Sequence, residues 1–249
     1  RRPAGARVLV CEKAQRHGGN AANSGGVIMA AGTDIQRARS VEDNVDDLYD
    51  HYMVHSKFLV VPALPRTLCE GGEPTLDWLR GHGVTFDPAN LYITGVESAK
   101  TPRGHPADGN GHAIMYALEN AAMARGLEVS VRTRVEGLIR DPGGAVRGIR
   151  ADGAEVTAAA VVIASGGFSA NLELLQRYFP QAGRHGADWH FAVGIKENSG
   201  DGLIMAQDVG AAIVGEGLGN SMLTASLSKE VEPYIPGWLV YVNEHGFRF

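Results

Sequence analysis

A short apolar run that ends in an acid, followed by a glycine-rich segment, constrains the fold of this chain most strongly. Residues 6–12 (ARVLVCE) are too few for a helix and fit a buried parallel strand that ends at Glu12. Residues 17–33 (HGGNAANSGGVIMAAGT) combine closely spaced glycines with small polar residues, so the main chain there can approach a ligand closely. The combination predicts an α/β fold built on a doubly wound parallel sheet.

The rest of the chain alternates between helical and strand-like patterns. Short strands with turn signals at 142–144 and 152–153 fill residues 127–164, which predicts an inserted β-hairpin region. The apolar run 160–164 predicts a central parallel strand. Helices are expected within residues 41–82 (two or three), at 112–126 with Gly126 at the C-terminal end, at 171–179 and from Gly202, and a hairpin is expected at 238–249.

Composition narrows the classes of partner. The formal net charge is −5, so the chain has no basic footprint for nucleic acid or an anionic membrane, and a small-molecule substrate is expected. No apolar run approaches the roughly 20 residues that cross a bilayer, so we expect no integral membrane segment and a cytoplasmic location. Cys11 and Cys69 lack paired spacing and are expected to be reduced core thiols. His51 and His55 have no third clustered ligand, so no metal site is predicted.

Three local features point to a nucleotide. Glu12 closes a strand, where an acid can accept hydrogen bonds from ribose hydroxyls or be a solvated strand end. Val135 begins a strand, and residues 164–167 (ASGG) end the apolar run in a turn that lets the backbone pass beside a nucleotide. The G-x-G-x-x-G turn that normally precedes such an acid by about 20 residues lies outside the sequence, which we attribute to a truncated chain.

Five segments occur in the order found in one family of flavoproteins. They are EKAQRHGGNAANSGG, HPADGNGHAIMYAL, VEGLIRD, VVIASGGF and NSGDGLIMAQDVGA. By these motifs the chain, from Ala4 to Phe249, resembles the FAD-dependent fumarate reductase, succinate dehydrogenase and 3-ketosteroid dehydrogenase flavoproteins. The resemblance implies an FAD/NAD(P)-binding fold, with an N-terminally truncated FAD-binding domain at 1–214 and the start of a substrate (capping) domain at 215–249.

The resemblance also implies a set of FAD-binding residues. Glu12 would bind the adenosine ribose, and the main chain at Val135 would face the adenine. The pyrophosphate and isoalloxazine would be lined by Gly19, Asn20, Ser24, Gly25 and Gly26, and the pocket would be completed by Ala164, Ser165, Gly166 and Asp201. Asp201 has an alternative role as the N-cap of the helix that follows it.

The resemblance gives weaker guidance on the substrate. Met222 stands where fumarate reductases place a substrate-binding histidine, which disfavours a dicarboxylate. Residues 25–38 (GGVIMAAGTDIQRA) are closer to the ketosteroid dehydrogenases, although Ala31 replaces one glycine. We expect Arg248 to be structural and predict no catalytic residue, because the proton-transfer arginine of the family would follow Phe249. His105 is expected to be a loop histidine facing solvent, with a place near the flavin as the alternative.

The predicted function is an FAD-dependent oxidoreductase acting on a CH–CH or C=C bond next to a carbonyl or carboxylate. Its electron donor or acceptor is not predicted. Two alternatives remain at this point. One is a dinucleotide-binding module without redox activity, and the other is a catalytically inert fragment that binds FAD weakly or not at all.

Overall fold

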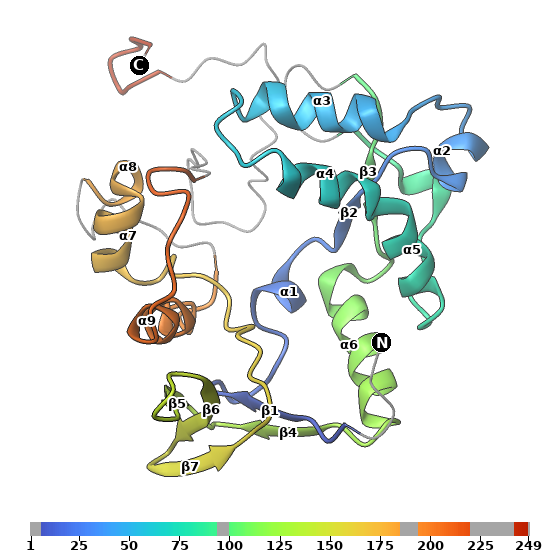
Figure 1. The fold of residues 1–249 in the computed structure, drawn as a ribbon. Coiled ribbons are helices and arrows are strands. Elements are labelled where there is room, and N and C mark those ends of the chain that lie inside the picture. The colour runs from blue at the N-terminus through green and yellow to red at the C-terminus, as the bar shows by residue number, and fades with distance from the viewer. Residues whose placement is uncertain (1–5, 94–99, 185–193, 220–241, 249) are drawn as a thin grey trace. The chain divides into compact units, whose positions relative to one another are not determined.

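The computed structural model describes residues 6–93, 100–184, 194–219 and 242–248. The chain divides into two compact units. Unit 1 is formed by Arg1–Gly26 with Gly109–Gly219, and unit 2 by Val27–Asp108 with Asn220–Phe249. Each unit is described by itself below, with the elements labelled in Figure 1.

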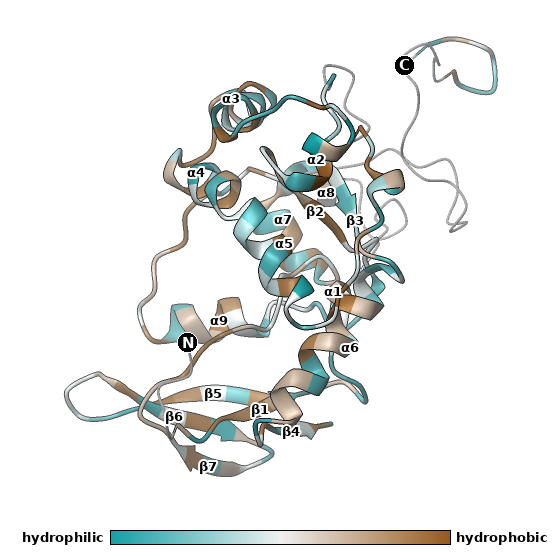
Figure 2. Cartoon of the chain, turned by 90° about the vertical axis from the view of Figure 1, so that its right-hand side faces the viewer, coloured by the Kyte–Doolittle hydropathy of each residue, from teal (hydrophilic) through white to brown (hydrophobic). Residues whose placement is uncertain are grey.

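Unit 1 contains a parallel strand pair. β1 (Leu9–Glu12) pairs with β4 (Glu128–Val131), with Leu9 opposite Glu128 and Glu12 opposite Val131. The parallel pairing agrees with the prediction for residues 6–12. β1 is hydrophobic except at its last residue (Figure 2), yet Leu9 and Val10 are exposed, so this strand is less buried than predicted.

An antiparallel sheet follows in unit 1. β5 (Val135–Arg140), β6 (Val146–Ala151) and β7 (Ala154–Thr157) are joined by tight turns in the order β5-β6-β7. The turns contain Gly144 (φ 88°) and Gly153 (φ 75°), whose left-handed backbone favours glycine. The predicted hairpins are therefore confirmed for residues 135–157, including the strand that begins at Val135, whereas β4, which the prediction grouped with them, pairs in parallel with β1.

The prediction of a central parallel strand at residues 160–164 is wrong for this structure. The segment has no strand assignment, and Val162 is 88 % exposed. A strand requires a hydrogen-bonded neighbour, and none of the described strands pairs with this segment. The apolar composition of this segment gives it a high β propensity, but a segment with such a propensity forms a strand only where a neighbouring strand can pair with it.

Unit 1 also contains five of the described helices, two that precede β4 in the sequence and three that follow β7. They are α1 (Gly19–Asn23), α6 (Asn110–Met123), α7 (Leu172–Tyr178), α8 (Pro180–Gly183) and α9 (Asp201–Asp208). Asn171 caps α7 by accepting the Leu174 N–H, and α7 buries Leu174, Leu175 and Tyr178. The Tyr178 hydroxyl accepts a hydrogen bond from Gln207 of α9 at 2.8 Å, which fixes the two helices to each other.

Unit 2 is a helical cluster beside a short strand pair. β2 (Val27–Met29) pairs antiparallel with β3 (Gly104–Pro106), and a 3₁₀ turn, η1 (Pro88–Asn90), precedes β3. The helices are α2 (Asp34–Ala38), α3 (Val45–His55), α4 (Ala63–Glu70) and α5 (Gly72–Arg80). The last three confirm the helices predicted within residues 41–82. Ala31, Leu48 and Cys69 form a fully buried cluster between them.

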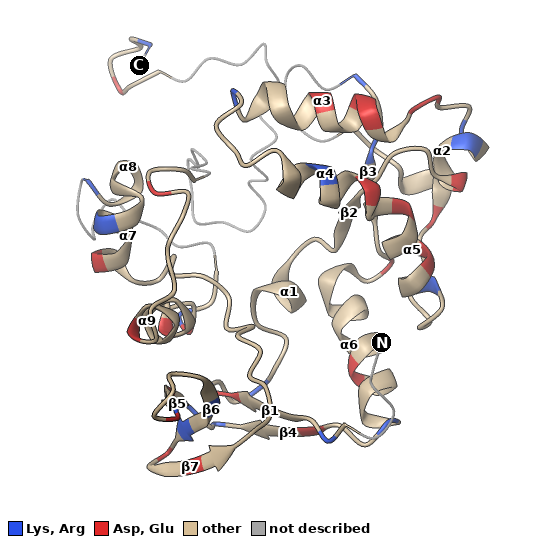
Figure 3. Ribbon diagram, in the orientation of Figure 1, with Lys and Arg blue, Asp and Glu red and all other residues tan. Residues whose placement is uncertain are grey.

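Ion pairs on the surface join α2 to α5. Arg80 lies 3.1 Å from Asp34, and Arg37 lies 3.2 Å from Glu73, so both signs of charge occur on each helix (Figure 3). Burial raises the pKa of Asp34, but the Arg80 guanidinium outweighs this effect and holds that pKa below its ordinary value. Ion pairs as exposed as these contribute little to stability. The stability of unit 2 therefore depends mainly on its buried residues.

A buried polar network runs through unit 2 and corrects the prediction for His105. That side chain is 1 % exposed rather than facing solvent. Its Nδ1 lies 2.9 Å from the Arg103 carbonyl oxygen and 3.2 Å from the Ile28 carbonyl oxygen, and its Nε2 lies 2.9 Å from the Thr33 hydroxyl. Carbonyl oxygens only accept, so these partners assign the proton to Nδ1 and make Nε2 the acceptor for Thr33.

The same network contains a buried ion pair. Arg103 donates from Nε and Nη2 to the two carboxylate oxygens of Asp43, at 2.7 and 2.6 Å. Gln36 donates to Asp43 at 2.9 Å and forms a capping box with Thr33 at the start of α2. Bonded charges of this kind are stable in a core because their polar atoms are paired.

Several predictions fall outside the described residues. Met222 and residues 238–241 and 249 of the predicted hairpin are among them, and within the described residues 242–248 Val242 and Arg248 form an isolated antiparallel bridge. The domain boundary near residue 214 stays a prediction. None of the described helices is long and apolar enough to cross a membrane.

Candidate functional site

The residues predicted to bind a cofactor all belong to unit 1. They come from five segments of the chain: the end of β1, α1 and the turn after it, the start of β5, the 164–166 turn, and the start of α9 (Figure 1). The contacts described below connect four of these segments to one another. The turn after α1 is connected instead to the first residues of α6.

Glu12 and Val135 are brought together by main-chain hydrogen bonds. The Thr133 N–H donates to the Glu12 carbonyl oxygen at 2.9 Å, and the Arg132 N–H donates to the Ala14 carbonyl oxygen at 2.9 Å. These bonds extend the β1-β4 pairing and set the first residue of β5 close to the end of β1. The Glu12 carboxylate accepts the Ala14 N–H through Oε1 at 2.7 Å, and Oε2 has no hydrogen bond to a described residue.

Asp201 is tied to the same strand end through Lys13. The Lys13 ammonium lies 2.9 Å from Asp201 Oδ2 and 2.6 Å from the Ser199 hydroxyl, which in turn lies 3.0 Å from Asp201 Oδ1. Gly200 is the N-cap of α9, and Asp201 is its first helical residue, so the alternative of Asp201 as N-cap is wrong. Burial opposes ionisation of Asp201, but the bonds from Lys13 and Ser199 lower its pKa below the ordinary value.

The 164–166 turn packs against the loop before α9. The Gly167 N–H donates to Asn198 Oδ1 at 2.6 Å, and the Gly200 N–H donates to the Gly167 carbonyl oxygen at 3.0 Å. A Cβ on Gly202 would lie 2.1 Å from the Ser165 hydroxyl, so the close approach of α9 to this turn requires glycine. Gly166 has a left-handed φ of 76°.

The glycine-rich segment is a short helix followed by a turn. Asn20, in α1, accepts the Ile195 N–H through its side-chain oxygen at 2.8 Å, which connects it to the loop before α9. The Ser24 carbonyl oxygen accepts the Gly111 N–H at 3.0 Å. Gly26 has a φ of 65°, and a Cβ there would lie 2.4 Å from the carbonyl carbon of Asn110, at the start of α6.

The residues of this site fit a dinucleotide. The side chains or main chain of six predicted residues are exposed: Asn20, Ser24, Gly25, Ala164, Ser165 and Gly166. Exposed main chain in glycine turns offers N–H donors to a diphosphate at close range. The half-buried Glu12 offers a carboxylate oxygen to hydroxyl groups. Unit 1 therefore has the construction of a dinucleotide-binding α/β protein.

The comparisons with known proteins specify this class further. The chain belongs to the FAD binding domain family, whose model matches residues 2–223. This confirms the predicted family and FAD as its cofactor. The chain is 30 % identical over 216 residues to a fumarate reductase (cytochrome) of Shewanella frigidimarina, covering 84 % of the chain and 36 % of that protein.

Two further similarities extend across the family. A urocanate reductase of Eggerthella lenta is 28 % identical over 221 residues, covering 85 % of the chain and 35 % of that protein. The solved structure of a 3-ketosteroid-Δ4-(5α)-dehydrogenase from Rhodococcus jostii RHA1 matches with a TM-score of 0.74 and 28 % identity, covering 84 % of the chain and 50 % of that structure. These matches confirm the predicted fold class. The chain spans about a third of the length of the curated relatives that it matches.

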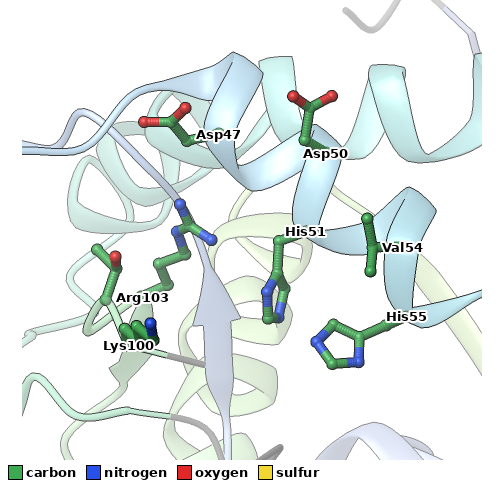
Figure 4. Close-up of a pocket in the computed structure, with 8 residues that line it drawn as sticks. Asp47, Asp50, His51, Val54, His55, Lys100 and Arg103 are labelled. Carbon is green, nitrogen blue, oxygen red and sulfur yellow. The ribbon is translucent and has the colours of Figure 1, made fainter. Parts of the chain in front are cut away.

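Unit 2 contains a separate small pocket, of about 310 Å³. Its lining residues are Asp47, Asp50, His51, Val54, His55, Lys100, Thr101 and Arg103. Figure 4 shows the carboxylates of Asp47 and Asp50 turned away from the two imidazole rings, whose centroids lie 4.2 Å apart. Burial, followed by the neighbouring His55 and Arg103, lowers the pKa of His51. Among the described residues no three potential ligands gather into a metal site. Acidic and basic groups line the pocket together, so its charge selects no class of ligand.

Sequence reasoning missed Lys13 and Ser199. Lys13 directly follows the strand-end acid, and Ser199 precedes Asp201 by two residues within the motif NSGDG. Their proximity to two predicted site residues was the available signal. Nothing in the spacing of residues separated by more than 180 positions could show that they meet.

Proposed function

We propose that this protein is an FAD-dependent oxidoreductase that acts on a carbon–carbon single or double bond next to a carbonyl or carboxylate. One observation carries the proposal: the contacts of unit 1 bring Glu12, Val135, Ser165 and Asp201 to neighbouring positions in a chain that belongs to the FAD binding domain family. The flavin, when bound, supplies the redox chemistry, and the protein supplies orientation and electrostatics.

The residues of the chain divide the work of binding. Glu12 accepts hydrogen bonds from the adenosine ribose, since Oε2 has no hydrogen bond to a described residue. The main chain at Val135 faces the adenine. The other residues line the pyrophosphate and the isoalloxazine: Gly19, Asn20, Ser24, Gly25, Gly26, Ala164, Ser165, Gly166 and Asp201. The exposure of Ser24, Gly25 and residues 164–166 supports this assignment, because a bulky dinucleotide needs uncovered main chain.

The substrate class follows from what the relatives share. The names fumarate reductase, urocanate reductase and 3-ketosteroid-Δ4-(5α)-dehydrogenase all refer to small molecules whose reacting carbon–carbon bond lies next to an electron-withdrawing group. The proposed substrate is therefore an enone or an unsaturated acid. Met222 disfavours a dicarboxylate, and a cytoplasmic location is part of the proposal. The proton donor stays unassigned.

The experiment that tests the function is a redox assay of the holoenzyme, expressed from its complete gene. We expect a yellow protein that dithionite bleaches and that an acceptor then reoxidises, with fumarate, urocanate and a steroid enone as the three probes. Protein that stays colourless after FAD addition would disprove the proposal. Bound flavin that none of the three acceptors reoxidises faster than buffer alone would favour the non-redox module instead.

A matched pair of variants tests the site itself. Glu12→Gln removes a charged acceptor from the ribose, and hydrogen bonds to charged groups contribute about 1.5–3 kcal/mol, so FAD affinity should fall by roughly 10- to 100-fold. Glu128→Gln is the control, because Glu128 is an exposed acid on the partner strand β4. Equal FAD affinities in the two variants would remove Glu12 from the site.

A further inference from the structure

We propose that Lys13 is a positioning residue of the flavin site: it joins the end of β1 to the start of α9 and neutralises Asp201 before the cofactor binds. This inference rests on the proposed function. It concerns a side chain that reaches across 188 positions of sequence to a residue of the proposed site.

The geometry of the contact is that of a closed network. Lys13 lies 2.9 Å from Asp201 Oδ2 and 2.6 Å from the Ser199 hydroxyl, and that hydroxyl lies 3.0 Å from Asp201 Oδ1. The Lys13 and Asp201 side chains are 24 % and 14 % exposed. Charge-assisted bonds at such distances, largely screened from water, are stronger than surface ion pairs.

The donors and acceptors of the network leave little freedom at Asp201. An ammonium has three N–H donors, and two of those of Lys13 are directed at Asp201 and Ser199. Both carboxylate oxygens of Asp201 accept hydrogen bonds from the protein. Asp201 is therefore held in one orientation, and its charge is balanced. An unbalanced carboxylate at this position would repel the diphosphate of a dinucleotide.

The position of Lys13 in the chain gives the contact its consequence. Lys13 directly follows Glu12. The ion pair between Lys13 and Asp201 therefore also fixes the distance from the proposed ribose-binding acid, Glu12, to the first turn of α9. Arg134 reaches Asp201 as well, but at 3.4 Å and from an exposed side chain, which makes it a weak substitute. Binding energy depends on such preorganisation, because a loosely held site must be ordered when the ligand binds.

The test compares FAD affinity in lysine variants of the holoenzyme after removal of its flavin. Lys13→Met should raise the dissociation constant of FAD at least tenfold, and Lys13→Arg, which keeps the charge and the donors, should stay within threefold of the wild type. Lys196→Met is the matched control, because Lys196 lies in the loop of unit 1 that precedes α9 and its side chain is 92 % exposed. It should also stay within threefold.

The outcomes separate this inference from the proposed function. A wild type that binds no FAD overturns both. A wild type that binds FAD alongside a Lys13→Met variant of equal affinity overturns the inference alone, and so does a Lys13→Arg variant as weak as Lys13→Met, since a charge-independent packing role would explain it.

A second pair of variants keeps the inference testable where Lys13→Met does not fold. Ser199→Ala removes the bridging hydroxyl and should weaken FAD binding two- to fivefold in the wild type. In a Lys13→Gln background, which lacks the ammonium that Ser199 and Asp201 share, the same change should have a smaller effect, because interacting residues are not additive. Equal effects in both backgrounds would show that Ser199 and Lys13 act independently and would overturn the network.

Discussion

The two units of this chain differ in what they bury. Unit 2 buries most of the apolar side chains that the structure shows as inaccessible, from Ala30 and Leu48 to Leu76 and Ala107, and it buries a paired polar network with them. Unit 1 buries Leu174, Leu175 and Tyr178 at α7, but it leaves glycine turns and apolar strand residues such as Val162 exposed.

This difference separates stability from binding. Buried side chains and satisfied polar groups stabilise unit 2 without any ligand. Unit 1 instead keeps exposed glycine turns and one carboxylate oxygen without a hydrogen bond to a described residue, and a partly buried ion pair joins distant segments beside the proposed site. A region that must receive a large cofactor cannot fill that volume with its own side chains. Substitutions in unit 2 should therefore act on folding, and substitutions at the site of unit 1 on cofactor binding.

The largest effect on stability is expected at the buried ion pair of unit 2. Asp43→Ala leaves Arg103 buried without its partner, so the free energy of unfolding should fall by about 3–5 kcal/mol. The Asp43 side chain is 1 % exposed, whereas Asp46, which pairs with Arg66, is 82 % exposed. Asp46→Ala should therefore change stability by about 1 kcal/mol or less. Urea denaturation measures both, and equal losses would contradict the division between core and surface.

A slightly smaller effect is expected in the apolar core of the same unit. Leu48→Ala should reduce the free energy of unfolding by about 2–5 kcal/mol, because Leu48 is fully buried against Ala31 and Cys69. Leu64→Ala on α4 is the control, since that side chain is exposed. The same denaturation experiment compares them, and a Leu64 variant as unstable as the Leu48 variant would show that the exposed face of α4 is covered.

The glycine turn of unit 1 gives a third comparison. Gly26→Ala combines a left-handed φ with a contact of 2.4 Å to the start of α6, whereas Gly126 has a left-handed φ of 75° and no heavy atom near its missing Cβ. Gly126→Ala should cost about 1 kcal/mol from backbone strain, and Gly26→Ala about 1–3 kcal/mol more from the clash. FAD affinity should fall in the Gly26 variant alone. A loss of affinity in both would mean that turn geometry is not specific to the site.

The smallest effect is a pH dependence from His105. Burial lowers the pKa of His105 below 6.5 in the folded protein, although the hydrogen bonds to the Arg103 and Ile28 carbonyl oxygens act in the opposite direction. As the pH falls below 6.5 the unfolded chain binds a proton at this residue before the folded chain does, so stability decreases toward low pH, by at most about 1.4 kcal/mol per pH unit.

Comparison with two variants isolates this effect. The difference in urea midpoint between pH 7.5 and pH 5.0 should shrink in His105→Gln and stay unchanged in His245→Gln, because His245 is exposed. A wild type and a His105 variant with the same pH dependence would show that folding does not shift the pKa of His105.

Local patterns in the sequence predicted much of the fold. The hairpins of β5, β6 and β7 follow from turn glycines at 144 and 153, and α3 to α5 follow from apolar spacing and from Gly71 and Gly81. The predicted site residues all belong to one unit, and most of them lie at or next to the end of a helix or strand. The predicted strand at 160–164 failed, since hydrogen-bonded neighbours and not composition decide whether an apolar run becomes a strand.

The sequence by itself determined the helices of residues 45–80, the hairpins of β5 to β7, the places of the glycine turns and the family of flavoproteins to which the chain belongs. These properties depend on a few adjacent residues, through backbone sterics and the period of apolar positions. The tertiary structure alone decided that His105 is buried, that Asp201 begins α9 rather than capping it, and that Lys13 meets Asp201. Those contacts join residues far apart in sequence, and packing of the complete unit determines which distant groups meet.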